Sequence, residues 1–233
     1  MPEYDFRDAV TKCWTIRADA AERQADRGTT DVGLRAEVTS GRHMAPLESL
    51  VAQIFIDAGL PESGLFLKSK RELPGYFRAE KQWDIVAVHK GSLVAAVELK
   101  SQLGSYGKNL NNRAEEAIGN AMDLIVAGKE DLLGPRPPWL GYVFIMQDDE
   151  ESRAPVGVRE PHFPTDSEFK DASCQKRIAI MCRRFLIQRL YNAAWFVTGK
   201  PEATFESVQE PDIELTFAKF AAAIRGRVGE ILA

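Results

Sequence analysis

The chain has 233 residues, 45% of them hydrophobic and 27% charged, with a formal net charge of −4. These values are ordinary for a soluble globular protein, and no overall basic charge favours nucleic acid, so any such binding must use local patches. The sequence contains no repeat, no low-complexity tract and no apolar run long enough to span a membrane. Three cysteines without a CxxC spacing argue against a zinc cluster or a disulfide framework. The first residues lack the features of a signal peptide, so we expect a cytoplasmic protein.

Helical spacing of apolar residues begins the chain. It predicts an amphipathic helix over residues 5–25, followed by a loop to residue 42. Pro46 suits the first turn of a second helix, and Gly59 suits the position just past its end. Glu48 lies near the start of this helix. It is either an acid favoured by the helix dipole or a carboxylate offered to a site, and both interpretations stay open.

A short candidate strand and a basic segment come next. Residues 65–67 are apolar and predict the first strand. A Pro74-Gly75 turn then lies among basic residues, which either form a solvated loop or contact phosphate: Lys68, Lys70, Arg71 and Arg78.

Residues 83–88 and 93–100 are two apolar, β-branched runs, and the turn between them is typical of a β-hairpin. A loop at residues 90–92 would set Asp84 opposite Glu98, and Lys100 would share the face of Glu98. Buried charges are costly unless something compensates them, and a divalent cation held by both carboxylates would do so. The alternative is an edge hairpin with a surface salt bridge between Glu98 and Lys100.

The segment that follows Lys100 is rich in glycine, asparagine and cations. Because it leaves the strand directly after the charged residues, residues 101–113 should lie near a bound substrate, where amides read adenine and arginine reads guanine or phosphate. The alternative is a plain flexible loop. Asn112 would cap a helix over residues 113–127.

The rest of the chain predicts one strand and two helices. Residues 139–146 read as a fully buried strand, and residues 147–171 as a long polar segment of functional or disordered character. Apolar spacing predicts a long helix over residues 174–197 and a closing helix over residues 217–231. The basic face of the long helix is either solvated or follows a phosphate backbone, and it carries Lys176, Arg177, Arg183, Arg184 and Arg189.

The spacing of Asp84 and of Glu98-X-Lys100 resembles the active-site pattern of the PD-(D/E)XK nuclease superfamily. Trp83 stands where that pattern has proline. In the superfamily, a helix before the sheet often offers a glutamate to the metal site, which makes Glu48 the fourth catalytic candidate. The order helix, three strands, helix, strand also matches the core of the restriction-endonuclease-like fold.

Three segments together resemble the XhoI family of Type II restriction endonucleases: residues 98–102 (ELKSQ), 111–121 (NNRAEEAIGNA) and 184–194 (RFLIQRLYNAA). The likeness extends over most of the chain. It implies an α/β restriction-endonuclease-like fold with a mixed central sheet flanked by helices (αβββαβ core). We predict one domain over residues 1–233, with a core at about 44–147, an N-terminal helix and a C-terminal helical elaboration at about 172–233.

The resemblance also implies a function. One or two Mg²⁺ ions would be held by Asp84, Glu98 and the backbone carbonyl of Leu99, and Lys100 would position the attacking water or neutralise developing charge. The substrate would be double-stranded DNA, cut at the palindrome CTCGAG, and a palindromic target implies a homodimer.

The candidate DNA-contacting residues lie in the two polar segments 101–113 and 148–170. They are Gln102, Ser105, Tyr106, Lys108, Asn109, Asn111, Asn112, Arg113, Arg153 and Arg159. Three alternatives remain open: a structure-specific or repair nuclease on the same fold, a DNA-binding protein without catalysis, and, as the weakest, a protein-interaction scaffold.

Overall fold

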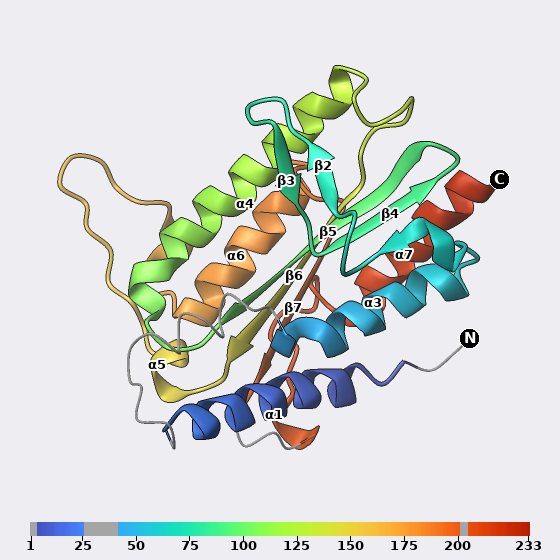
Figure 1. Ribbon diagram of the computed structural model, residues 1–233. Helices are drawn as coiled ribbons and strands as arrows, with labels where there is room; N and C mark the ends of the chain where they lie inside the picture. Colours follow the sequence, from blue (N-terminus) through green and yellow to red (C-terminus); the bar gives the residue numbers. More distant parts are fainter. Residues whose placement is uncertain (1–3, 26–41, 201–204) are drawn as a thin grey trace.

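A five-stranded mixed sheet forms the centre of the molecule in the computed structural model, which describes residues 4–25, 42–200 and 205–233 (Figure 1). The strand order is β1-β4-β5-β6-β7. The first two pairings are antiparallel, and the β5–β6 and β6–β7 pairings are parallel. The strands of this sheet are β1 (Leu65–Phe66), β4 (Ile85–His89), β5 (Ser92–Gln102), β6 (Leu140–Gln147) and β7 (Ala193–Gly199).

Helices cover both faces of the sheet, and each face has its own hydrophobic core (Figure 1). Val97 and Leu99 face the first layer, whereas Ala96 and Tyr142 face the second. The first layer contains α1 (Phe6–Ala25), α3 (Ala45–Asp57) and α7 (Phe217–Leu232). The second layer contains α4 (Tyr106–Lys129) and α6 (Cys174–Ile187). Because side chains alternate along a strand, the even-numbered Glu98 and Lys100 face the layer of α4 and α6.

The first two helices are confirmed. α1 and α3 lie where helical spacing predicted them, and Gly59 follows α3 with a φ of +103°, a conformation that favours glycine. The loop predicted over residues 29–42 lies almost wholly outside the described residues. None of the described helices is long and apolar enough to span a membrane.

The β4–β5 hairpin has the predicted register next to the charged residues. Ile85 pairs with Val97, which places Asp84 just before the strand at the level of Glu98. The loop itself is shorter than predicted. Ser92 pairs with His89, and an irregularity between Ala87 and Val88 absorbs the difference, so only residues 90–91 form the turn. Both turn residues have positive φ, as the two-residue hairpin turn requires.

The prediction for residues 101–113 is wrong in its secondary structure. β5 continues to Gln102, and α4 already begins at Tyr106, so Asn112 lies in the second turn of the helix and does not cap it. Ser105 turns the chain with a φ of 47°. The polar composition hid this helix because its inward contacts depend on only a few apolar residues, among them Tyr106 and Leu110.

The long helix predicted over residues 174–197 is also wrong. α6 ends at Ile187, Arg189 adopts a φ of 55°, and residues 193–199 form β7 at the edge of the sheet. An apolar run of seven residues fits a buried strand as well as a buried helix. Asn192 links the turn to the sheet, since its Oδ1 accepts a hydrogen bond from the N–H of Leu140 at 2.8 Å. The sheet therefore extends beyond residues 44–147.

Smaller elements complete the described chain. The sequence did not predict a separate two-stranded sheet, β2 (Glu72–Pro74) with β3 (Glu80–Gln82). The segment after β6 is mostly irregular, as predicted, but it contains a single helical turn, α5 (Glu150–Arg153). The short 3₁₀ turns are η1 (Arg42–Met44), η2 (Glu62–Gly64), η3 (Ser167–Phe169) and η4 (Phe205–Ser207).

Candidate active site

Asp84 is held against the middle of β5. Its Oδ2 accepts a hydrogen bond from the backbone N–H of Leu99 at 2.6 Å, and the guanidinium of Arg71 donates to its backbone carbonyl at 3.4 Å. The side chain therefore lies beside the strand segment that carries Glu98 and Lys100. The pairing predicted from the hairpin register brings these three residues together.

Glu98 is an ion-paired carboxylate that is only 3% exposed. Its Oε1 lies 2.5 Å from Nζ of Lys100, and its Oε2 lies 2.6 Å from Nζ of Lys81. Burial alone would raise the pKa of Glu98, but the two ammonium groups outweigh it and hold the pKa below its ordinary value. Glu98 in turn raises the pKa of Lys100 against the effect of burial. Both residues stay charged at neutral pH.

The neighbouring acid shifts in the opposite direction. Burial and then the charge of Glu98 raise the pKa of Asp84 to about 6, although the Leu99 N–H and the lysines act against the shift. Two adjacent carboxylates whose pKa values are pushed apart are typical of catalytic and ion-binding sites.

Glu48 reaches the same region from the first turn of α3. Burial and then the charge of Asp84 raise its pKa to about 7, while Arg71 acts in the opposite direction. Glu48 is thus both a first-turn acid and a carboxylate within electrostatic range of Asp84. The two interpretations of its position are compatible.

Lys81 is the residue that sequence reasoning missed. It lies on β3, contacts Glu98 from outside the central sheet and places its Nζ 4.2 Å from the centre of the Trp83 ring. The only signal in the sequence was the Pro74-Gly75 turn, which a short hairpin needs and which would have brought Lys81 toward Asp84.

The donors present suit a hard divalent cation. Carboxylate oxygens of Asp84 and Glu98, with the carbonyl of Leu99 between Glu98 and Lys100, are the ligand types that Mg²⁺ prefers. Within residues 4–25, 42–200 and 205–233, no group of three or more histidine, cysteine or acidic side chains is arranged to hold a metal ion. A metal at this site would therefore need the backbone and water as further ligands.

The predicted DNA-contacting residues fall into two groups. Gln102 and Tyr106 are buried, at 4% and 0% exposure, and the Tyr106 hydroxyl donates to Asp149 at 2.7 Å, so neither presents a side chain for DNA. Arg113 is half-buried and pairs with Glu116 at 3.0 Å. Lys108 lies in the first turn of α4. The remaining candidates are half-buried or exposed: Ser105, Asn109, Asn111, Asn112, Arg153 and Arg159.

The basic face of α6 is largely engaged within the chain. Arg183 pairs with Asp212 at 2.5 Å, and Arg184 pairs with Asp166 at 2.7 Å and with Glu168 at 2.9 Å. These ion pairs hold Arg183 and Arg184 within the chain, which disfavours the interpretation that this face follows a phosphate backbone.

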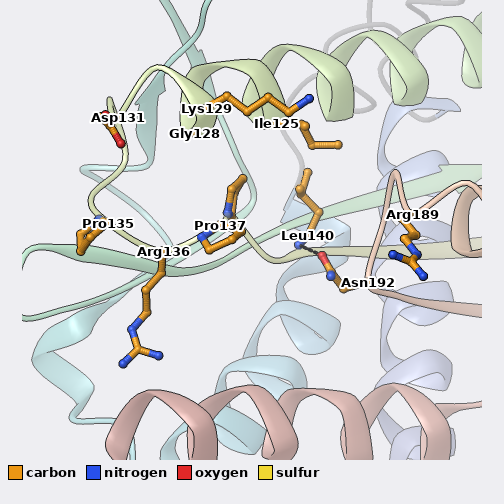
Figure 2. A pocket seen from close by; sticks show the side chains of 11 residues that line it. Ile125, Gly128, Lys129, Asp131, Pro135, Arg136, Pro137, Leu140, Arg189 and Asn192 are labelled. Carbon is orange, nitrogen blue, oxygen red and sulfur yellow. Dashed lines mark hydrogen bonds between the residues drawn. The ribbon is translucent and has the colours of Figure 1, made fainter.

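A separate pocket of about 470 Å³ opens at the other end of α4, and Figure 2 shows its lining. Lys129, Arg136, Arg189 and Asp131 contribute charge to it. It contains none of the acids or lysines around Glu98, and Leu140 at the start of β6 forms part of its wall. It is therefore distinct from the carboxylate site.

A mixed sheet whose central strand β5 carries Glu98 and Lys100, with Asp84 beside them just before β4, defines a class, the restriction-endonuclease-like α/β proteins. Comparison with known proteins gives the family. Residues 23–208 match the family model described as restriction endonuclease XhoI. The chain belongs to this family of Type II restriction endonucleases. No solved structure shows a significant match to it.

Three curated relatives support this assignment. The chain is 38% identical to the Type II restriction enzyme XhoI of Xanthomonas vasicola, over 91% of this chain and 89% of that protein. It is 37% identical to the Type II restriction enzyme BstVI of Geobacillus stearothermophilus, over 82% and 88%. The Type II restriction enzyme AbrI of Azospirillum brasilense is 38% identical over 69% of this chain and 73% of its own length.

Proposed function

We propose that this enzyme is a Mg²⁺-dependent endonuclease that cuts double-stranded DNA with Asp84, Glu98 and Lys100. The observation that carries the proposal is the 2.6 Å hydrogen bond from Leu99 to Asp84, which joins the acid to the strand segment where Glu98 and Lys100 form their 2.5 Å ion pair. Glu48 is a third acid, within electrostatic range of Asp84, and is proposed as an auxiliary member of the site.

Each residue has a proposed role. Asp84, Glu98 and the carbonyl of Leu99 would hold one or two Mg²⁺ ions, which lower the pKa of a bound water and offset charge on the phosphoryl oxygens. The ammonium of Lys100 lies beside the ligands, where it can orient the attacking water and offset charge on the phosphate. The Leu99 N–H fixes the direction of the Asp84 carboxylate.

The DNA sequence and the assembly are part of the same proposal. Relatives at 37–38% identity include an enzyme named XhoI, which supports CTCGAG as the target. A palindrome is read most simply by a twofold dimer in which each subunit cuts one strand. We therefore propose a cytoplasmic homodimer, with DNA contacts from the first turns of α4 and from residues 148–170.

The direct test is digestion of a plasmid that carries one CTCGAG site, beside the same plasmid with that site altered. We expect one linear product with Mg²⁺, none with EDTA, and no cleavage of the altered plasmid. A smear from both plasmids would contradict site specificity and favour a structure-specific or repair nuclease. Intact DNA at every Mg²⁺ concentration would favour a binding protein without catalysis.

The residue assignment is tested with Glu98→Gln and a matched control, Glu214→Gln. Glu214, just before α7, also pairs with a lysine, Lys219 of α7 at 2.7 Å, but both side chains are exposed. We expect Glu98→Gln to lose at least about 100-fold in cleavage while it still shifts DNA in a gel, because a ligand and an ion-pair partner are lost. Undiminished cleavage by Glu98→Gln would refute the assignment.

The assembly is tested by sedimentation of the protein alone and with the site-bearing duplex. We expect a dimer under both conditions. Monomers that remain monomers on DNA would refute it.

A further inference from the structure

Lys81 pairs with a carboxylate oxygen of Glu98, and this ion pair would have to open before that oxygen could bind a metal ion. Its Nζ lies 2.6 Å from Oε2 of Glu98, while Lys100 occupies Oε1. Both side-chain oxygens of this proposed ligand are therefore engaged by ammonium groups in the described structure.

The local charges balance before any metal binds. Asp84 and Glu98 offer two negative charges, and Lys81 and Lys100 offer two positive ones, with the Lys81 side chain 13% exposed and that of Lys100 24%. Glu48 and Arg71, which interact electrostatically beside Asp84, add one charge of each sign and keep the balance. A divalent cation added to this set would leave two excess positive charges in a poorly solvated place, which is costly. The departure of one lysine removes half of that excess.

Of the two lysines, Lys81 is the one whose backbone lies outside the central sheet. Lys100 lies on β5, two residues from Glu98, and pairs with Phe144 inside the central sheet. Lys81 lies on β3, whose ladder pairs it only with β2 in a separate two-stranded sheet (Figure 1).

The ammonium of Lys81 has two contacts besides Glu98. Nζ donates a hydrogen bond to the carbonyl of Gln82 at 3.0 Å and lies 4.2 Å from the centre of the Trp83 ring. Carbonyl and cation–π contacts would keep the ammonium partly satisfied after it leaves Glu98. Trp83 stands where the superfamily pattern has proline, and this contact gives that departure a physical use.

We propose that Lys81 occupies the divalent-cation position on Glu98 in the metal-free protein and withdraws from it when a divalent cation binds. Lys81 is thus a positioning residue. It competes with the metal ion for Glu98, and it keeps the buried Glu98 carboxylate paired when no metal is bound. The proposal rests on the proposed function, because it requires Asp84 and Glu98 to be the ligands.

The first experiment measures Ca²⁺ binding by calorimetry in the absence of DNA. We compare the wild type with Lys81→Met, which keeps an unbranched side chain over Trp83 but removes the charge, and with Lys219→Met, which removes a remote lysine from an exposed pair with Glu214. We expect Lys81→Met to bind Ca²⁺ about tenfold more tightly, within the usual range of site-to-site coupling, and Lys219→Met to match the wild type. Unchanged or weaker binding by Lys81→Met would overturn the proposal.

The second experiment needs no variant and so does not depend on how Lys81→Met folds. The wild type is treated with a lysine-acetylating reagent, with EDTA or with saturating Ca²⁺, and the label on each lysine is read by mass spectrometry. We expect the labelling of Lys81 to rise several-fold with Ca²⁺, while Lys100 stays protected and Lys219 does not change. Protection of Lys81 at a Ca²⁺ concentration that saturates the binding isotherm would overturn the proposal.

The two levels of failure are distinguishable. If Ca²⁺ binds the wild type but Asp84→Asn does not bind it, the metal site stands, and a protected Lys81 refutes only its displacement. If neither the wild type nor Lys81→Met binds Ca²⁺, the metal assignment of Asp84 and Glu98 fails, and the inference about Lys81 fails with it.

Discussion

Two buried acidic clusters on the same side of the sheet differ in how their charge is satisfied. Asp123 on α4 is 4% exposed, and three donors surround it: the N–H groups of Tyr76 and Phe77, each at 2.8 Å, and Nε of Arg78 at 2.6 Å. These donors overcome burial and lower the pKa of Asp123. The Asp84 carboxylate accepts a hydrogen bond from the Leu99 N–H at 2.6 Å, but burial and the charge of Glu98 raise its pKa to about 6.

The difference separates an acid whose charge is stabilised by the fold from an acid whose charge is disfavoured by its surroundings. Asp123 fastens the tip of the β2–β3 hairpin to α4, and Arg78 adds a bond to Asn120 at 2.8 Å. Asp84 lies beside Glu98, a second carboxylate, and burial and this like charge outweigh the Leu99 N–H and the lysines that favour its ionised form. Groups with unfavourable burial and a like charge beside them are concentrated at functional sites.

The largest expected effect breaks the Asp84 cluster. Asp84→Asn should cut cleavage by about 1,000-fold or more, because a proposed metal ligand is lost. Its unfolding temperature in EDTA should equal or exceed that of the wild type, because a buried like-charge contact is removed. Plasmid cleavage rates and thermal unfolding measure the two effects, and a clear loss of stability would show that the Asp84 charge supports the fold.

The matched change at the other cluster should have the opposite outcome. Asp123→Asn removes the charge that binds Arg78 and should lower stability by about 2 kcal/mol, or about 6 °C in unfolding temperature for a chain of this size. Denaturant titration and thermal melts measure the change. An unfolding temperature equal to that of the wild type would mean that the hairpin tether is not a stabilising contact.

His43 extends the comparison of Asp84 with Asp123, because its pKa is strongly shifted although it lies outside both acidic clusters. Burial and then the charge of Arg17 lower its pKa to about 4, and its Nε2 lies 3.0 Å from Oγ of Ser101. The unfolded chain takes up a proton near pH 6.5, whereas the folded chain does so only near pH 4. Stability should therefore fall as the pH is lowered from 6.5 to 4.

His43→Gln tests that expectation. The variant should lose less stability than the wild type between pH 6.5 and pH 4, as measured by unfolding in denaturant at each pH. Its cleavage should stay within about threefold of the wild type, since Ser101 points to the opposite face of β5 from Lys100. A large loss of cleavage would extend the site to that face of the strand.

The sequence predicted the relative placement of Asp84, Glu98 and Lys100 better than it predicted the chain around them. Asp84, Glu98 and Lys100 were placed correctly relative to one another because strand register is a local rule, and Ile85 does pair with Val97. Lys81 was missed because its contact with Glu98 depends on the packing of β2 and β3 against the sheet, which no period in the sequence reports. α1, α3 and β6 were predicted from strong periodicity or length.

The errors share one physical origin. Residues 106–112 and 193–199 both carry patterns that suit two conformations, and tertiary contacts decide between them. Tyr106 was predicted to contact DNA from a polar segment, but it is buried with its hydroxyl on Asp149. The sequence left open whether the arginines of α6 are solvated or follow a phosphate backbone, and only the fold shows that Asp166 and Asp212 pair with Arg184 and Arg183.

The smallest expected effect concerns those arginines. Arg184 pairs with Asp166 and Glu168, and all three side chains are substantially exposed, so Arg184→Ala should cost no more than about 0.5 kcal/mol. If this face makes no phosphate contact, the slope of DNA affinity against salt concentration should equal that of the wild type, whereas loss of one phosphate contact would reduce it by about one. Lys68→Ala is the useful partner variant, because Lys68 is an exposed member of the basic segment before β2. Its removal should reduce the slope if that segment contacts DNA.

A reduced slope for Arg184→Ala would mean that its ion pairs open on DNA. The ion-paired arginines of α6 would then belong with the functional surface.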